Sequence, residues 1–297
     1  AGNVSVDGGT IKLDGNYPNG TANVALGNAA LDTASGSNGY SVAIGNNALT
    51  AMTTGGSNTV VGAGAAVAIN SGANNVALGT DALTSTTSAS FNTAVGSAAL
   101  QSNTTASNNT AVGYQAAYNN TTGQEITAVG RFALNANTTG SNSTATGVQS
   151  LQSNTTGADN ASFGRLGLGA NTTGSNNTSV GSAALRNNTT AIGNTAVGFQ
   201  AGYANTTGIN NTAVGKDSLL TATTASDNVA VGREAMKRAT TGHSNTGIGT
   251  EALKETTTGA YNTALGNDAL LSNTTASNNT AVGYQAGYSN TTGDLNT

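Results

Sequence analysis

Apolar and polar residues alternate along this chain in a pattern that returns every 17 residues. The consensus is N-T-A-V-G-x-x-A-L-x-x-N-T-T-G-x-N, and its positions are numbered 1 to 17 below. The glycine at position 5 recurs from Gly27 to Gly283, first after 18 residues and then always after 17. Loops normally vary in length between repeats, so this constant spacing indicates that the whole unit is structural.

The unit predicts strands and turns rather than helices. A repeat of two helices needs about 33 residues, and this unit is shorter and rich in Thr, Asn and Gly. The sequence therefore predicts an all-β fold, a parallel β-solenoid of about sixteen 17-residue coils over residues 23–297 that continues beyond the C-terminus. Residues 1–22 depart from the repeat, and we expect them to form an N-terminal cap or the end of a preceding region.

Side chains alternate across a strand, so positions 2 and 4 share one face and position 3 lies on the other. We assign the valine column at position 4 to the coil interior and the small alanine column at position 3 to the opposite face. The leucine at position 9 is expected to fill the interior from the other wall. The predicted core therefore contains Val95, Val112, Val129, Val197, Val214, Val282, Leu100, Leu134 and Leu185.

Glycine occupies position 5 in all sixteen units. A corner with positive φ, or a site where a Cβ atom would collide with the next coil, explains why no other residue appears there. The predicted structural turn residues include Gly96, Gly113, Gly130, Gly198, Gly215 and Gly283.

Two large aliphatic side chains per coil contribute about 1.5–3 kcal/mol each, which is little against the entropy of ordering a whole unit. Backbone ladders between coils and stacked asparagines must add to this. Asn holds position 1 in 13 of 16 units, and a second Asn usually precedes the Thr-Thr pair. In-register asparagines predict amide ladders like those of cross-β stacks. Self-association would add stability.

The composition argues against several functions. Nine basic residues in 297 and a net charge of -4 do not provide the positive surface that nucleic acid or an anionic membrane needs. No apolar run is long enough for a transmembrane helix, and there is no cysteine. His243 is the only histidine, and the acidic residues are dispersed. We therefore expect no enzyme, no cofactor and no metal site.

Threonine rows offer an alternative function, because a flat outward row of threonines could bind ice. Thr-Thr pairs recur, but consecutive residues face opposite ways, so only one of each pair can join an outward column. The simpler interpretation is that threonine forms strands and its hydroxyl caps a turn.

Asn-x-Thr sequons suggest a second alternative, a filament decorated with glycans. A repeat rich in Asn and Thr also produces such sequons by chance. The candidate glycosylation sites are Asn103, Asn120, Asn137, Asn154, Asn171, Asn205, Asn273 and Asn290.

Three units replace the leucine at position 9 by a small residue and carry an aromatic residue at position 10: Tyr118, Tyr203 and Tyr288. The same units carry Tyr114, Phe199 and Tyr284 at position 6. We interpret these aromatic residues as volume compensation in the core; contact with receptor sugars is the alternative.

The segment S-V-A-I-G-N-N-A at 41–48 resembles the repeat in the head domains of trimeric autotransporter adhesins. The N-T-A-V-G-Y-Q-A and S-N-T-T-G segments, with the entry at 9–18, resemble repeats of bacteriophage tail-fibre and related virion proteins more closely. The adhesin family implies a left-handed parallel β-roll that assembles as a trimer, although its repeat unit is shorter than this one.

Together these observations predict a structural fibre shaft or head for surface attachment, of the phage tail-fibre or bacterial adhesin type. The expected partners are the chain itself, as a homotrimer or fibre, and a cell-surface glycan or receptor, with no nucleic acid and no membrane insertion. The expected location is extracellular, on a virion or cell surface.

Overall fold

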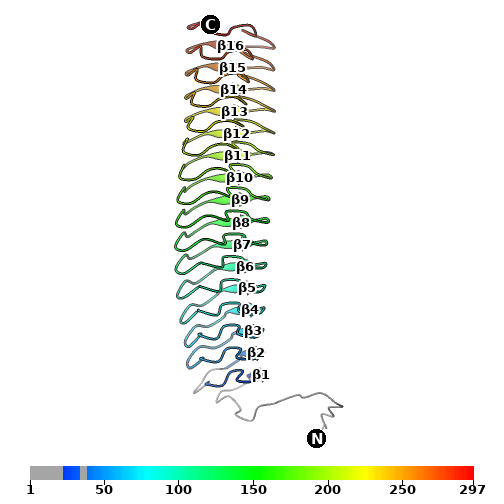
Figure 1. Cartoon of the computed structure of the whole chain (residues 1–297), viewed down its shortest axis with the longest axis vertical. Coiled ribbons are helices and arrows are strands. Elements are labelled where there is room, and N and C mark those ends of the chain that lie inside the picture. Colours follow the sequence, from blue (N-terminus) through cyan, green and yellow to red (C-terminus); the bar gives the residue numbers. More distant parts are fainter. Residues whose placement is uncertain (1–22, 34–38) are drawn as a thin grey trace, which may run out of the picture. The chain divides into compact units, whose positions relative to one another are not determined.

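The structure is a computed structural model that describes residues 23–33 and 39–297. The predicted N-terminal cap at 1–22 lies outside the described residues. The chain divides into two units, one ending at Ile126 and the other spanning Thr127–Thr297. Each described repeat contributes one three-residue strand, and the described residues contain no helix (Figure 1).

In the first unit the strands are β1 (Val24–Leu26), β2 (Val42–Ile44), β3 (Thr59–Val61), β4 (Val76–Leu78), β5 (Thr93–Val95) and β6 (Thr110–Val112). In the second unit they are β7 (Thr127–Val129), β8 (Thr144–Thr146), β9 (Ala161–Phe163), β10 (Thr178–Val180), β11 (Thr195–Val197), β12 (Thr212–Val214), β13 (Val229–Val231), β14 (Thr246–Ile248), β15 (Thr263–Leu265) and β16 (Thr280–Val282).

Within each unit every strand pairs in parallel with the next one along the chain, and equivalent repeat positions are partners. Thr195 of β11, for example, pairs with Thr212 of β12, and Val197 pairs with Val214. The predicted parallel β-solenoid with a 17-residue coil is therefore confirmed.

Hydrogen bonds between coils continue well beyond the short strands. Around one coil of the second unit, the amides of Thr178, Leu185, Asn187 and Thr189 donate to carbonyls of the following coil at 2.8–3.1 Å. These residues occupy positions 2, 9, 11 and 13, so the ladder runs around most of the circuit. Backbone bonding thus supplies cohesion that the thin core does not.

The chain bends inside each coil through residues in the left-handed region. Positions 7, 9 and 17 repeatedly adopt φ near +50° to +60°, as at Ala183 (58°), Leu185 (49°) and Asn176 (58°). Asn and Asp tolerate this conformation, which accounts for their frequency at position 17. Leucine does not favour it, so its packing must hold it there.

The glycine at position 5 meets both requirements predicted for it. Gly198 has φ of +136°, and a Cβ atom there would lie 2.6 Å from the carbonyl oxygen of Gly215 in the next coil. All six glycines predicted as structural turns have φ between 128° and 136°: Gly96, Gly113, Gly130, Gly198, Gly215 and Gly283.

The prediction for the strand interior is wrong at position 4. Alanine at position 3 is fully buried, as at Ala196, whereas Val197 beside it is 37% exposed. The two lie on opposite faces of the strand, and the methyl group of alanine fits the narrow interior opposite leucine. The one valine at position 3, Val60, is also buried, in a coil where Ala66 replaces leucine at position 9. The residues wrongly assigned to the core are half-buried or exposed on the outer strand face: Val95, Val112, Val129, Val197, Val214 and Val282.

The leucines assigned to the core are confirmed, since Leu100, Leu134 and Leu185 are at most 2% exposed. Interior volumes are matched between neighbouring coils. Where Met236 replaces leucine at position 9, Gly247 replaces alanine at position 3 of the next coil, and a Cβ atom there would lie 3.1 Å from Met236 Cγ.

Two columns of buried asparagine confirm the predicted amide ladders. At position 1, Asn194 Nδ2 donates to Asn177 Oδ1 (3.3 Å) and to the Gly208 carbonyl (2.9 Å). At position 12, Asn171 Nδ2 donates to Asn154 Oδ1 (2.7 Å) and to the Gly174 carbonyl (2.9 Å). Each amide therefore joins two coils and also closes a turn.

Candidate functional site

Because alanine and leucine fill the interior, the variable side chains of each repeat lie outside. Positions 6, 7, 10 and 11 flank the buried residues at 8 and 9, and we call the surface that they form the turn face. The strand face consists of positions 2 and 4, and the edge consists of positions 14, 16 and 17. Any recognition by this solenoid must use these surfaces.

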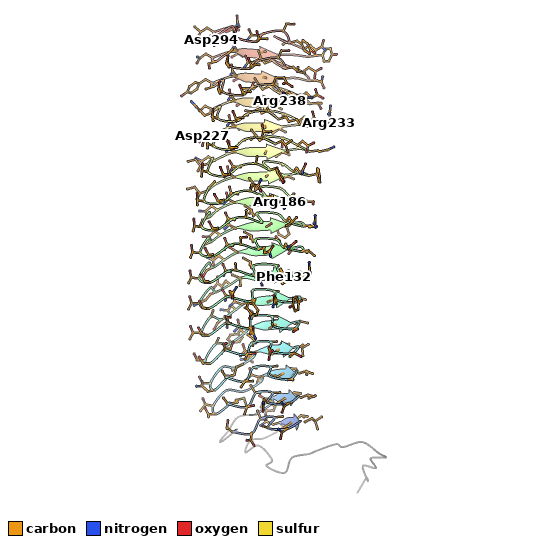
Figure 2. The ribbon with its side chains drawn as sticks, viewed as in Figure 1. Phe132, Arg186, Asp227, Arg233, Arg238 and Asp294 are labelled. Atoms are coloured by element: carbon orange, nitrogen blue, oxygen red, sulfur yellow. The ribbon has the colours of Figure 1, made fainter. Side chains whose placement is uncertain are left out.

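Charge is unevenly distributed over these surfaces in the second unit. Asp159, Asp227 and Asp294 lie on the edge, and Figure 2 shows Asp227 and Arg233 on opposite sides of the ribbon. All basic residues within the described ranges belong to the turn face at positions 6, 10 and 11: Arg131, Arg165, Arg186, Lys216, Arg233, Lys237, Arg238 and Lys254.

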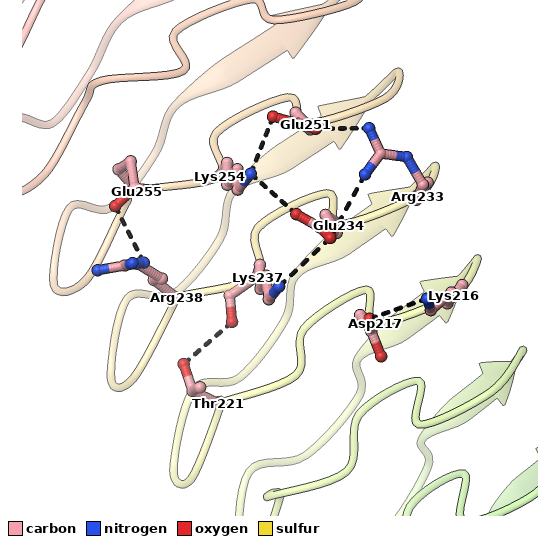
Figure 3. Close-up of polar contacts among 10 residues, drawn as sticks. All are labelled: Lys216, Asp217, Thr221, Arg233, Glu234, Lys237, Arg238, Glu251, Lys254 and Glu255. Carbon is pink, nitrogen blue, oxygen red and sulfur yellow. Dashed lines mark hydrogen bonds and ion pairs between the residues drawn. The ribbon is translucent and has the colours of Figure 1, made fainter.

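The densest charge cluster joins the coils of β13 and β14 (Figure 3). Lys254 Nζ lies 2.8 Å from Glu234 and 2.9 Å from Glu251, so one ammonium bridges carboxylates on adjacent coils. Arg233 contacts the same two carboxylates, and Lys237 reaches Glu234 at 3.3 Å. All three cations pair with the two carboxylates, which makes the cluster a clamp between coils rather than an open binding site.

Hydrogen bonds within the cluster shift the pKa values of its two carboxylates and of Lys254. The bond from Lys254 lowers the pKa of Glu234, with a further contribution from Lys237. The bonds from Lys254 and then Arg233 lower the pKa of Glu251. The two carboxylates in turn raise the pKa of Lys254. All three groups are therefore held in their charged forms.

The aromatic residues do not fill the core, which corrects their interpretation as volume compensation. Tyr114, Phe199 and Tyr284 are 48%, 49% and 72% exposed. Where Gly202 replaces leucine, Leu185 of the adjacent coil takes the space, because a Cβ atom on Gly202 would lie 3.0 Å from Leu185 Cδ2. The void that remains is about 10 Å³, enough for about one water molecule.

The sequon asparagines lie inside the coil. Seven of the eight candidate glycosylation sites are at most 2% exposed, and the eighth, Asn290, is half-buried. Their amide nitrogens donate within the position-12 ladder, as Asn154 Nδ2 does to Asn137 Oδ1 at 2.8 Å. A glycan needs this nitrogen exposed, so the folded coil does not accommodate the predicted decoration.

Threonine pairs behave as the simpler interpretation predicts. The hydroxyl of Thr172 at position 13 donates to the Thr189 carbonyl of the next coil at 3.0 Å. Thr173 at position 14 is exposed, so one threonine of the pair faces outward. The sequence analysis missed a second outward row, formed by the position-2 threonines of the strand face.

His243 lies exposed on the edge, edge-on to Tyr261 with ring centroids 5.0 Å apart. Among residues 23–33 and 39–297, no three His, Cys, Asp or Glu side chains gather as metal ligands would. The same residues contain no helix with the length and apolar character needed to cross a membrane.

No family model matches the sequence, and a search of curated proteins finds no match either. The geometry of the coil and the chemistry of its outer surfaces are therefore what indicate a function.

Proposed function

We propose that this chain is a structural fibre segment for surface attachment, of the kind found in phage tail fibres or bacterial surface adhesins, outside the cell on a virion or cell surface. The observation that carries the proposal is the coil itself, in which nearly every residue holds the next coil or faces outward. Backbone ladders and two buried asparagine columns build a rigid repeat, while the turn face varies freely. Such a molecule spans distance and displays a repeated surface.

The strand face supports self-association, and we propose a homotrimer. In the second unit, position 4 is apolar on seven successive strands, β9 to β15, and its side chains are half-buried or exposed. Phe163 is 45% exposed and Leu265 is 46% exposed. A continuous apolar file of this kind marks an interaction surface. Three copies that turn these files toward a common axis would bury them.

Sedimentation equilibrium tests this assembly. We expect a species of three times the 28.8 kDa chain mass. The triple variant Val180→Lys/Val197→Lys/Val214→Lys places charges on the strand face and should yield monomers that keep the β circular-dichroism signal. The control Thr190→Lys/Thr207→Lys/Thr224→Lys adds the same charges on the edge of the same coils and should remain trimeric. A wild-type chain that stays monomeric at all concentrations would overturn the proposal.

A second candidate function, ice binding, is favoured by one specific observation. The strand face carries Thr178, Thr195 and Thr212 in register on β10, β11 and β12, beside the apolar file. A trimer buries this face and a monomer leaves it open, so the two functions compete for one surface. Thermal hysteresis in a monomeric sample would favour ice binding, and its absence would favour the fibre.

A further inference from the structure

The turn face of the second unit has a hollow of about 360 Å³. It arises at Gly169, the only glycine at position 10 among the sixteen units. Gln152 and Arg186 hold the same position on the coils before and after it, so a missing side chain opens a gap between them. The backbone remains intact there, since the Ser153 amide donates to the Gly169 carbonyl at 3.2 Å and Ala170 donates to Arg186 at 2.9 Å.

Two arginines line this hollow, Arg165 from position 6 and Arg186 from position 10. Arg233 of the clamp contacts carboxylates, and the neighbouring Arg238 pairs with Glu255 at 3.0 Å. In the described part of the chain, no carboxylate lies within ion-pair distance of Arg165 or Arg186. Arg186 is held in place by the next coil, because its Nη1 donates to the Tyr203 hydroxyl at 3.3 Å and its guanidinium lies 5.9 Å from the ring centroid.

The remaining lining combines amides with a small apolar surface. Gln149, Gln152 and Asn187 contribute side-chain amides, which both donate and accept hydrogen bonds. Leu166 adds apolar surface beside them. Sugar hydroxyls match such amides, and a carboxylate matches guanidinium groups through paired hydrogen bonds.

We propose that this hollow binds a carboxylated sugar residue of a surface glycan, with Arg165 and Arg186 on the carboxylate and the amides on the ring hydroxyls. The inference deepens the proposed attachment function and rests on it for its biological setting. Binding is expected only at Gly169, because the other units place a side chain at position 10, where the sugar would lie.

Isothermal titration calorimetry with a galacturonic acid hexamer tests the site. We expect binding at low salt, and at least a tenfold loss of affinity for the methyl-esterified hexamer, which lacks the charge. Gly169→Gln fills the hollow without changing charge and should abolish binding. Glutamine already holds position 10 at Gln101 and Gln152, and Gly169 does not have a positive φ. An added Cβ atom would lie 3.2 Å from the Leu166 carbonyl oxygen, so circular dichroism of the variant should match that of the wild type before binding is compared.

Charge is tested separately from shape. Arg165→Gln/Arg186→Gln should lose binding, whereas Arg131→Gln/Lys216→Gln removes the same charge from the turn face outside the hollow and should retain it. Equal weakening in both double variants would overturn the site in favour of general electrostatic attraction. Absence of binding, equal binding of the ester, or binding of a sulfated hexasaccharide alone would also overturn the assignment. Sedimentation of the same samples separates the two proposals. A trimer that does not bind the hexamer contradicts only the glycan site, and a monomer that binds it contradicts only the trimeric fibre.

Discussion

At the scale of single residues, the buried asparagines use their amides as donors and acceptors at once. Asn171 donates to Asn154 and Gly174, and its own Oδ1 accepts from Asn188 Nδ2 at 2.8 Å. The ladder ends where alanine takes position 12. Asn205 is followed there by Ala222, and its Oδ1 has no hydrogen-bond partner.

Removing one ladder amide should therefore lower the free energy of unfolding by more than the loss of its own hydrogen bonds, because neighbouring amides lose a partner. Asn171→Ala leaves the buried Asn154 Oδ1 without a donor and removes one of two hydrogen bonds from the Gly174 carbonyl and from Asn188 Nδ2. An unpaired buried group costs about 1–3 kcal/mol, so we expect a clear fall in the thermal unfolding midpoint. The control Asn187→Ala removes the same group from the outer turn face and should have little effect. Equal midpoints for the two variants, measured by circular dichroism, would contradict the structural role of the ladder.

Some residues could be assigned from sequence because their chemistry allows one environment. The position-5 glycine follows from an identity that never varies at fixed spacing, and the asparagine ladders follow from an amide that recurs in register in most units. Which strand face is interior could not be derived from alternation, which fixes parity alone. The range of side-chain sizes at each position gives the missing signal. Position 3 holds only Ala, Ser, Gly and one Val, whereas position 4 holds side chains as different in size as Thr146 and Phe163. A site that accepts such different volumes borders open space rather than a packed core.

At the scale of elements, the clamp between the coils of β13 and β14 couples stability to pH. The pKa values of Glu234 and Glu251 lie below the ordinary 4.5, so their contribution is complete above that pH and is lost as pH falls through the lowered values. The pKa of Lys254 lies above the ordinary 10.5, so its contribution is complete below that pH and is lost as pH rises through the raised value.

The variant Glu234→Gln/Glu251→Gln should be less stable than the wild type at pH 7, by about 1 kcal/mol for such solvent-accessible pairs. This difference should shrink as the pH falls below 4.5 through the lowered pKa values, because the wild-type carboxylates then become protonated. Asp268→Asn changes a carboxylate at the same repeat position without an ion pair and should show no such pH dependence. Thermal midpoints measured from pH 7 down to the acid limit of folding test this, and a difference between variant and wild type that stays constant over the whole range would argue against the clamp.

The hollow at Gly169 could not be found from the consensus, because it depends on the coils on either side. Gly169 is apparent in the sequence as a departure from position 10, but its meaning requires the 17-residue register that places it between Gln152 and Arg186. The aromatic residues show the same limit. Because position 10 faces outward, Tyr203 contacts Arg186 instead of filling the core, and the direction of position 10 is known only from the structure.

At the scale of the whole molecule, stability and function share one geometric basis. Each coil templates the next through its backbone and asparagines, as expected for repeat architectures in which neighbouring units supply most contacts. The outward positions are then free to vary, which allows a clamp in one pair of coils and a hollow in another. The outer surfaces can therefore change without altering the interior.

Seventeen residues close one circuit of backbone, and every surface of the coil depends on this geometry. The chain has no cysteine, so engineered pairs report on it cleanly. Thr190→Cys/Thr207→Cys joins exposed edge positions 17 residues apart, which the register places on adjacent coils at about 4.8 Å, within disulfide reach. Ser182→Cys/Thr190→Cys is closer in sequence but lies half a circuit apart. Mass spectrometry after mild oxidation should find the intramolecular disulfide in the first pair only; crosslinking of the second pair instead would contradict the coil.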